Sequence, residues 1–187
     1  MIFIIGGARS GKSSFAEKKA LEIQETIQGN VVYLATSIVF DEDTKNRVEM
    51  HQSSRPSTWK TIEQYKSFQA LQEHEDFMGN KIILLDCLTL MITNLLLEEE
   101  DDFDTVSNER IRDIEQKIKE EIESLIMVCR SHNKILLVVS NEVGFGIVPA
   151  YRLGSIFRDI AGRMNQYIAS LADDVYLITA GIPLKIK

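Results

Sequence analysis

Short, continuous runs of apolar residues recur along the chain, and polar residues or glycine bound each of them. Such runs are typical of strands that are buried on both faces of a parallel sheet, because neither face has to meet water. They predict five strands, over Ile2 to Ile5, Asn30 to Thr36, Lys81 to Asp86, Lys134 to Ser140 and Asp173 to Gly181.

The longer segments between these runs carry apolar residues at helical spacing instead. They predict helices over Lys12 to Gln28, Ile62 to Phe77, Leu88 to Leu97, Thr105 to Ser131 and Leu153 to Leu171. Strands that alternate with helices indicate an α/β fold, in which helices flank a mostly parallel sheet joined by right-handed crossovers. A length of 187 residues suits one domain, over residues 1–187.

Composition narrows the class of protein. The hydrophobic share of 44% and the charged share of 26% are those of a soluble globular chain. A net charge of -7 gives no broad positive field, so a nucleic-acid partner is not expected. Cys87 and Cys129 lie among apolar neighbours and are expected to be free thiols. No apolar run is long enough for a membrane span, and we expect a cytoplasmic protein.

The first strand runs into a glycine loop that opens a helix. Gly6, Gly11, Lys12 and Ser13 match the phosphate-binding pattern G-x-x-x-x-G-K-[ST] at every fixed position. Main-chain N–H groups and the helix N-terminus would hold a polyphosphate there, with Lys12 on the β- and γ-oxygens and Ser13 on Mg²⁺. The alternative is a glycine turn with an accidental lysine. The loop predicts a P-loop NTPase-like, RecA-like fold that binds GTP or ATP through Gly6, Gly7, Ala8, Arg9, Ser10, Gly11, Lys12 and Ser13.

Asp86 ends the apolar run that precedes the helix at Leu88. A carboxylate at the carboxyl end of a buried strand can bind the Mg²⁺ that bridges the phosphates. An aspartate just before a helix is also a common N-cap. The sequence favours the metal ligand, since capping does not explain why the acid ends a buried strand.

His51 lies in an irregular polar segment, with Arg47 and Arg55 four residues away on either side. A neutral imidazole between two arginines can attack an activated phosphorus and pass the phosphoryl group on in a second step. Either arginine can neutralise charge that grows on the α-phosphoryl group. A surface histidine without a role is the alternative, and composition alone does not exclude it.

Seven segments, in order along nearly the whole chain, carry a resemblance to a known family. They are "GGARSGKS", "YLATS", "RVEMHQSSRPSTWKTIE", "DCLTLMITNLL", "NEVGFGIVP", "FRDIAGRMNQ" and "GIPLKIK". Together they resemble the bifunctional adenosylcobinamide kinase / adenosylcobinamide-phosphate guanylyltransferase family of cobalamin biosynthesis. The resemblance implies phosphorylation of adenosylcobinamide, a corrinoid, followed by transfer of GMP from GTP to that phosphate with release of pyrophosphate.

The resemblance also implies roles for single residues. It makes His51 the residue that carries GMP, and Met50 stands where some relatives have a second histidine. Asp86 stands where relatives often have glutamate, which keeps the charge. Mg²⁺ is implied as cofactor, and a homo-oligomer, commonly a trimer, as the assembly. The residues implied to line the GTP site are Ala35, Thr36, Ser37, His51, Gln52, Ser53, Ser54, Glu63 and Asp86.

Two other functions compete with this interpretation. A P-loop small-molecule kinase without a covalent histidine intermediate fits the residues alone. A GTP-dependent switch would need a guanine-reading N-K-x-D segment, and "NKIL" at Asn133 lacks the aspartate.

Two further segments keep open roles. Asn141 and Glu142 follow a strand and could contact substrate, whereas the glycines after them fit a turn equally well. For Arg158, Asp159, Arg163 and Asn165 we favour pairing within a helix or between subunits over contact with the corrinoid.

Overall fold

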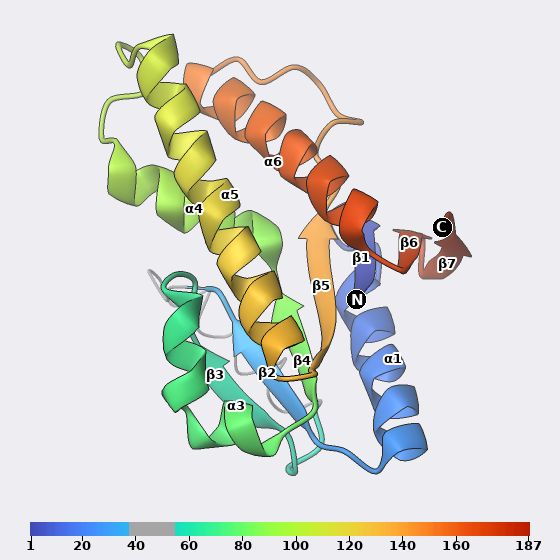
Figure 1. The fold of residues 1–187 in the computed structure, drawn as a ribbon. Helices are drawn as coiled ribbons and strands as arrows, with labels where there is room; N and C mark the ends of the chain where they lie inside the picture. Colours follow the sequence, from blue (N-terminus) through green and yellow to red (C-terminus); the bar gives the residue numbers. More distant parts are fainter. Residues whose placement is uncertain (38–54) are drawn as a thin grey trace.

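A seven-stranded sheet forms the centre of the computed structural model, which describes residues 1–37 and 55–187 (Figure 1). The strands lie in the order β3-β2-β4-β5-β1-β6-β7, all parallel except β7, which is antiparallel to β6. Their bounds are β1 Ile2–Gly6, β2 Val31–Ala35, β3 Lys60–Glu63, β4 Ile82–Asp86, β5 Ile135–Asn141, β6 Asp174–Thr179 and β7 Ile182–Lys185.

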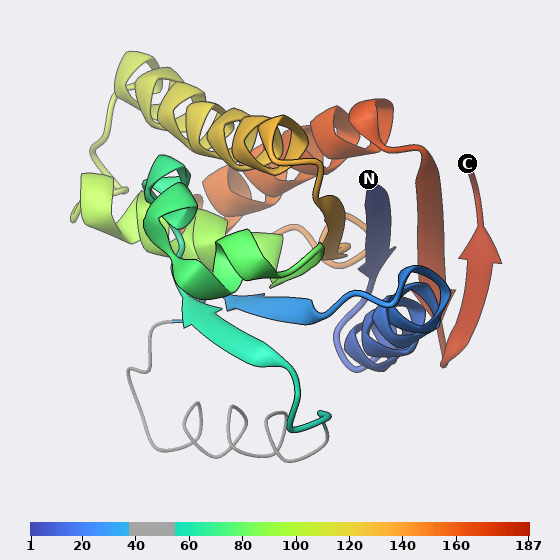
Figure 2. The same ribbon diagram turned by 60° about the horizontal axis from the view of Figure 1, so that its bottom comes forward.

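Helices cover both faces of the sheet. Helix α1 packs on one face, and α4, α5 and α6 cover the other (Figure 2). The helical segments are α1 Lys12–Ile27, the 3₁₀ segment η1 Phe68–Glu73, α3 Glu75–Gly79, α4 Leu88–Glu99, α5 Asn108–Ser131 and α6 Arg152–Leu171. The predicted α/β fold with a mostly parallel sheet flanked by helices is therefore confirmed.

Alternation along the central strands explains why their sequences are apolar throughout. In β1, Ile2 and Ile4 join the core under α1, together with Ala16 and Ala20. Phe3 and Ile5 point to the opposite core, beneath α4, α5 and α6. Because side chains alternate between two buried faces, no position in these strands is left for a polar residue.

The topology brings several strand ends to one edge of the sheet. Strand β5 lies between β1 and β4, and Gly6 pairs in register with Asn141 while Asp86 pairs with Val139. Asp86 is therefore two strands, about 10 Å, from the strand that leads into the glycine loop. Ligands of open α/β sheets bind at this carboxyl edge.

The helix predicted over Ile62 to Phe77 is wrong in large part. Its first residues end strand β3, which pairs with β2, and η1 and α3 follow as two short helical pieces. The buried positions Phe68 and Leu71 are three residues apart, a spacing that occurs on one face of both an α-helix and a 3₁₀ segment. Periodicity alone could not separate the two.

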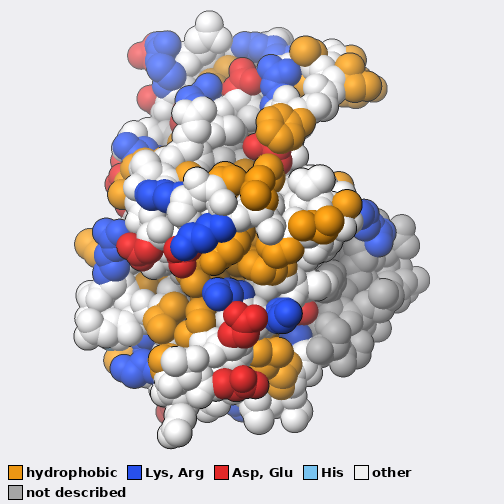
Figure 3. All heavy atoms as spheres, turned by 90° about the vertical axis from the view of Figure 1, so that its right-hand side faces the viewer, with side chains coloured by type: hydrophobic (Ala, Val, Ile, Leu, Met, Phe, Trp, Pro, Cys, Tyr) orange, Lys and Arg blue, Asp and Glu red, His pale blue; other side chains and the backbone are white. Residues whose placement is uncertain are grey.

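Strand β7 was not predicted. The run expected over Asp173 to Gly181 ends at a tight turn, in which Ala180 and Gly181 both have positive φ, and the chain returns as an edge strand. Its apolar side chains Ile182 and Leu184 are 70% and 59% exposed, so burial gave no signal for it. Hydrophobic side chains are visible between charged ones on the face that carries this hairpin (Figure 3).

Two expectations from composition can be compared with the structure. Cys87 and Cys129 are buried free thiols, as predicted. Among the helices of the described ranges, none combines the length and the apolar character that a membrane crossing requires.

Candidate nucleotide-binding site

The glycine loop curls around the side chain of its own lysine. Lys12 begins α1, is buried, and its Nζ donates to the carbonyl oxygen of Gly7 at 3.2 Å. The Ser10 N–H also donates to Gly7, at 3.3 Å, and closes the turn. The loop thus combines a positively charged group with the first N–H groups of a 16-residue helix, the arrangement that binds a polyphosphate.

Ser10 in the glycine loop has a buried hydroxyl group whose hydrogen-bonding capacity is unmet among the described residues. Its Oγ is buried and has no hydrogen-bond partner within residues 1–37 and 55–187. A buried hydroxyl without a partner costs free energy, so such groups are usually satisfied by a ligand or water. Its place in the loop fits a donor to a phosphate oxygen.

The turn of the C-terminal hairpin supports the glycine loop from the side. The Gly181 N–H donates to the Ser10 carbonyl at 2.8 Å. Gly11 and Gly181 also approach closely, since a Cβ on Gly11 would lie 3.3 Å from the Gly181 Cα. Sequence reasoning missed this contact between segments 170 residues apart, because no local pattern links them.

Gly181→Val is expected to loosen this support. Gly181 has φ +80°, which a β-branched residue adopts only with strain, so we expect a loss of about 1–3 kcal/mol in the free energy of unfolding. The KM for nucleotide should rise as well. Urea unfolding and nucleotide kinetics test this, with Gly162→Ala in α6 as control, where open space predicts a small gain in stability. A Gly181→Val protein that keeps both properties would contradict the supporting role.

Asp86 and Ser13 carry the oxygen atoms predicted to hold a divalent cation. Asp86 is half-buried at the end of β4, and Ser13 is half-buried in the first turn of α1. Cys87, not Asp86, occupies the N-cap position of α4, so the capping alternative does not hold. In the described ranges no three His, Cys, Asp or Glu side chains converge as a metal cluster. A carboxylate and a hydroxyl fit Mg²⁺, which takes its other ligands from phosphates and water.

A cluster of Glu17, Arg55 and Tyr33 lies beside Asp86. Arg55 Nε donates to Glu17 Oε1 at 3.0 Å, and the two side chains are only 7% and 16% exposed. The Arg55 guanidinium carbon also lies 3.2 Å from the centroid of the Tyr33 ring. Burial raises the pKa of Tyr33 far above its ordinary value, and the neighbouring Asp86 carboxylate adds to the rise. Tyr33 therefore stays protonated beside Asp86.

This cluster changes the interpretation of Arg55. We predicted that Arg55 could face the α-phosphoryl group, but its charge is balanced by Glu17, one helical turn beyond Ser13 on α1. The pair joins residue 55, where the described chain resumes, to the phosphate-binding helix. Arg55 is thus a positioning residue in this arrangement. Its partner Glu17 lies 38 residues earlier in the chain, so no local sequence pattern reveals the pair.

Glu17→Gln should be costly because it leaves the Arg55 guanidinium buried without its countercharge. We expect a loss of about 1–3 kcal/mol in the free energy of unfolding. Glu22→Gln breaks the exposed pair with Lys19, 3.1 Å apart, and should cost at most about 0.5 kcal/mol. Urea unfolding of both variants measures the difference, and equal losses would show that burial of the Arg55 pair is without effect.

Asn141 is held by a polar network at the carboxyl edge. Its Nδ2 donates to Thr89 Oγ1 at 2.5 Å, and its carbonyl accepts from Asn165 Nδ2 at 3.1 Å. Since Asn141 pairs in register with Gly6, the network places it next to the glycine loop. Glu142 instead accepts from the Gly144 N–H at 2.6 Å and belongs to a turn. Glu142 therefore belongs to the turn, and a substrate contact for Asn141 stays a prediction.

The other predicted site residues lie at varied distances from the loop. Thr36 is buried, and its hydroxyl bonds the main chain of Cys87, donating to the carbonyl at 2.7 Å and accepting from the N–H at 3.0 Å. Ala35 and Ser37 flank Thr36 at the end of β2. Glu63 pairs with Ala35 four strands, about 19 Å, from β1, so it would meet the far end of a bound nucleotide. Their nucleotide contacts stay predictions.

Several predicted residues lie outside the described ranges: Arg47, Met50, His51, Gln52, Ser53 and Ser54. The helix α6 pairs are described. Arg158 pairs with Asp159 at 2.9 Å, and Arg163 bonds Glu115 of α5 at 2.5 and 2.9 Å. Pairing is therefore what these arginines do, as favoured from sequence, although the second pair joins two helices of one chain.

Comparisons with known proteins cover the same residues. A family model described as Cobinamide kinase / cobinamide phosphate guanyltransferase matches residues 2–186. The Bifunctional adenosylcobalamin biosynthesis protein CobU of Escherichia coli (strain K12) is 44% identical over 187 residues, which are 100% of this chain and 99% of that protein. The protein of the same name from Salmonella typhimurium (strain LT2) is 40% identical, with 100% and 99% covered. The Bifunctional adenosylcobalamin biosynthesis protein CobP of Pseudomonas aeruginosa (strain PAO1) is 34% identical, with 98% and 95% covered.

Proposed function

The chain belongs to the cobinamide kinase / cobinamide phosphate guanyltransferase family, and from this membership we infer the two reactions that it catalyses. It phosphorylates the hydroxyl of adenosylcobinamide with ATP or GTP. It then transfers GMP from GTP to that phosphate and releases pyrophosphate and adenosylcobinamide-GDP. The observation that carries this function is the glycine loop, which closes around a buried Lys12 at the carboxyl edge of the sheet.

The phosphorylation step rests mainly on positioning. The acceptor hydroxyl oxygen attacks the γ-phosphorus, the bond to the β-phosphate oxygen breaks, and the nucleoside diphosphate leaves. Lys12 and the N–H groups that begin α1 face the oxygens on which charge grows, so they stabilise the transition state more than the ground state. The hydroxyl proton leaves as the new bond forms, to a phosphoryl oxygen or to water, and no residue of the chain is proposed as general base for this step.

Mg²⁺ is part of the proposal. Ser13 and Asp86 would hold it, and when bound it neutralises phosphate charge. Tyr33, protonated beside Asp86, offers a hydroxyl donor next to that carboxylate. The Arg55 guanidinium packs on the Tyr33 ring and is itself held by its hydrogen bond to Glu17.

The GMP transfer is proposed to run through His51. The imidazole nitrogen attacks the α-phosphorus. The bond between the α-phosphorus and the oxygen that bridges it to the β-phosphorus breaks, and pyrophosphate leaves. A phosphate oxygen of adenosylcobinamide phosphate then takes GMP from the imidazole, which is regenerated. Four residues of chain span at most about 14 Å, and Arg55, four residues after His51, is anchored beside Asp86. The anchor limits how far His51 can lie from the Arg55 main chain, and its approach to the α-phosphate is part of the proposal.

Labelled GTP tests the covalent step. The protein is incubated with GTP labelled at the α-phosphate or, separately, at the γ-phosphate, quenched in base, and digested for mass spectrometry. We expect an acid-labile GMP adduct on His51 from the α-label and none from the γ-label. Turnover of adenosylcobinamide phosphate without any adduct would overturn the histidine intermediate.

A further inference from the structure

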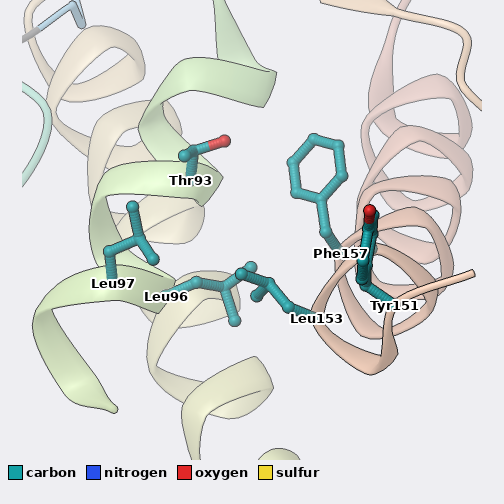
Figure 4. Close-up of a pocket in the computed structure, with 7 residues that line it drawn as sticks. Thr93, Leu96, Leu97, Tyr151, Leu153 and Phe157 are labelled. Atoms are coloured by element: carbon teal, nitrogen blue, oxygen red, sulfur yellow. The ribbon is translucent and has the colours of Figure 1, made fainter. Parts of the chain in front are cut away.

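An apolar pocket of about 400 Å³ lies between α4 and the start of α6. From α4 it is lined by Thr93, Leu96 and Leu97, and these face Tyr151, Leu153 and Phe157 across the gap (Figure 4). The lining holds no charged side chain. A concave site of this size and chemistry suits the hydrocarbon surface of a ligand and does not suit a phosphate.

The walls of this pocket are fixed by contacts of their own. The Arg152 guanidinium donates to the main-chain carbonyls of Asp104 and Val106, both at 2.6 Å, and so ties the start of α6 to the connection between α4 and α5. Pro149 packs against Gly154, which lines the pocket, and a Cβ on Gly154 would lie 2.8 Å from the Pro149 Cβ. These contacts fix the start of α6, which forms one wall of the pocket, against the neighbouring connections.

Helix α4 leads from the carboxyl edge of the sheet to the pocket. Thr89 accepts the hydrogen bond of Asn141, which stands beside Gly6, and Thr93 donates to the Thr89 carbonyl one turn further on at 2.9 Å. Leu97 follows after another turn, so the pocket lies within about 12 Å of the carboxyl edge along the helix. A ligand seated there can reach the γ-phosphate with a flexible arm.

The segment from Asn141 to the pocket is also apolar and exposed. Phe145, Ile147 and Val148 are 85%, 95% and 71% exposed, and Tyr151 at its end is 80% exposed. Large apolar side chains exposed on one segment mark a binding surface. Tyr151 lines the pocket, so this exposed segment leads into it.

We infer that the pocket between α4 and α6 binds an apolar edge of the corrinoid acceptor, with its hydroxyl arm lying along α4 toward the glycine loop. The inference rests on the proposed function, which supplies a macrocyclic acceptor too bulky for the phosphate loop. Binding in this pocket explains how one nucleotide site can serve two acceptor groups. The macrocycle stays bound in the pocket while the end of its arm changes from a hydroxyl to a phosphate.

Two substitutions test the pocket. Leu97→Glu and Tyr151→Glu place a carboxylate at side chains that are 48% and 80% exposed, so neither has to bury a charge in order to fold. Equilibrium dialysis of cobinamide, followed by its visible absorbance, should show affinity weakened about tenfold or more in both variants, because a charge would face hydrocarbon. The KM for GTP should stay unchanged. Met127→Glu, 59% exposed near the end of α5, should keep wild-type affinity.

The outcomes separate the pocket from the proposed function. Wild-type affinity for cobinamide in both glutamate variants overturns the assignment of the corrinoid to this pocket. If affinity is retained while sedimentation velocity shows a changed oligomeric state, the surface is instead a contact between copies of the chain. A wild-type protein that neither binds nor phosphorylates cobinamide would instead overturn the proposed function.

Discussion

Replacing His51 by asparagine is expected to lower GMP transfer to adenosylcobinamide phosphate by at least about 10³-fold, because no other group is proposed to take GMP from GTP. Phosphorylation of adenosylcobinamide should fall far less, since that step needs only the glycine loop and its cation. Chromatography of the corrinoid products measures both rates with the same enzyme preparation.

The matched control for this variant is His74→Asn. His74 is an exposed histidine that precedes α3, and no role in either reaction is proposed for it. If His51→Asn transferred GMP at the wild-type rate, GMP transfer would not run through a covalent intermediate on His51. If both reactions fell equally, His51 would act in binding or folding rather than in one step.

Lys12→Ala should impair both reactions, by about 10²–10³-fold each in kcat/KM, because one ammonium group serves the phosphates in either step. The side chain is buried and bonds only the Gly7 carbonyl among its described contacts, so removal should leave the sheet intact. Circular dichroism and both product assays check this.

Lys18→Ala is the control for the lysine variant. Lys18 is exposed on the same helix and should be neutral in both assays. A Lys12→Ala enzyme that lost phosphorylation but kept GMP transfer would show that the two reactions use different nucleotide sites, and the single-site mechanism would fail.

The parts of the fold that sequence predicted well are those buried on both sides. Strands β1, β2, β4 and β5 have apolar residues at every central position because each face meets a helix layer. The glycine loop was predictable for a related reason, since its spacing follows from local main-chain geometry.

The parts that sequence predicted poorly depend on distant partners. Strand β3 has one buried residue, Ile62, and β7 has none, so their pairing with β2 and β6 decides their structure. The two buried residues of η1, Phe68 and Leu71, are three residues apart, and this spacing resembles that of an α-helix. Only the completed sheet distinguishes these cases.

The candidate site divides along the same line. Lys12, Ser13 and Asp86 were predicted from short motifs, and the structure places them at one edge of the sheet. The pairing of Arg55 with Glu17 and the contact of Gly181 with Ser10 join segments far apart in the chain, and no local pattern encodes them. The sequence suggested a phosphate contact for Arg55 because it shows a charge without showing its partner.

The central claim is that one glycine loop holds the nucleotide for both reactions, and the covalent step tests it most directly. GTP labelled at the α-phosphate is incubated with the wild-type protein, with Lys12→Ala and with Lys18→Ala, and the label on His51 is counted. The shared loop predicts that labelling is lost in Lys12→Ala and retained in Lys18→Ala. Full labelling of His51 in a Lys12→Ala protein that no longer phosphorylates adenosylcobinamide would contradict it.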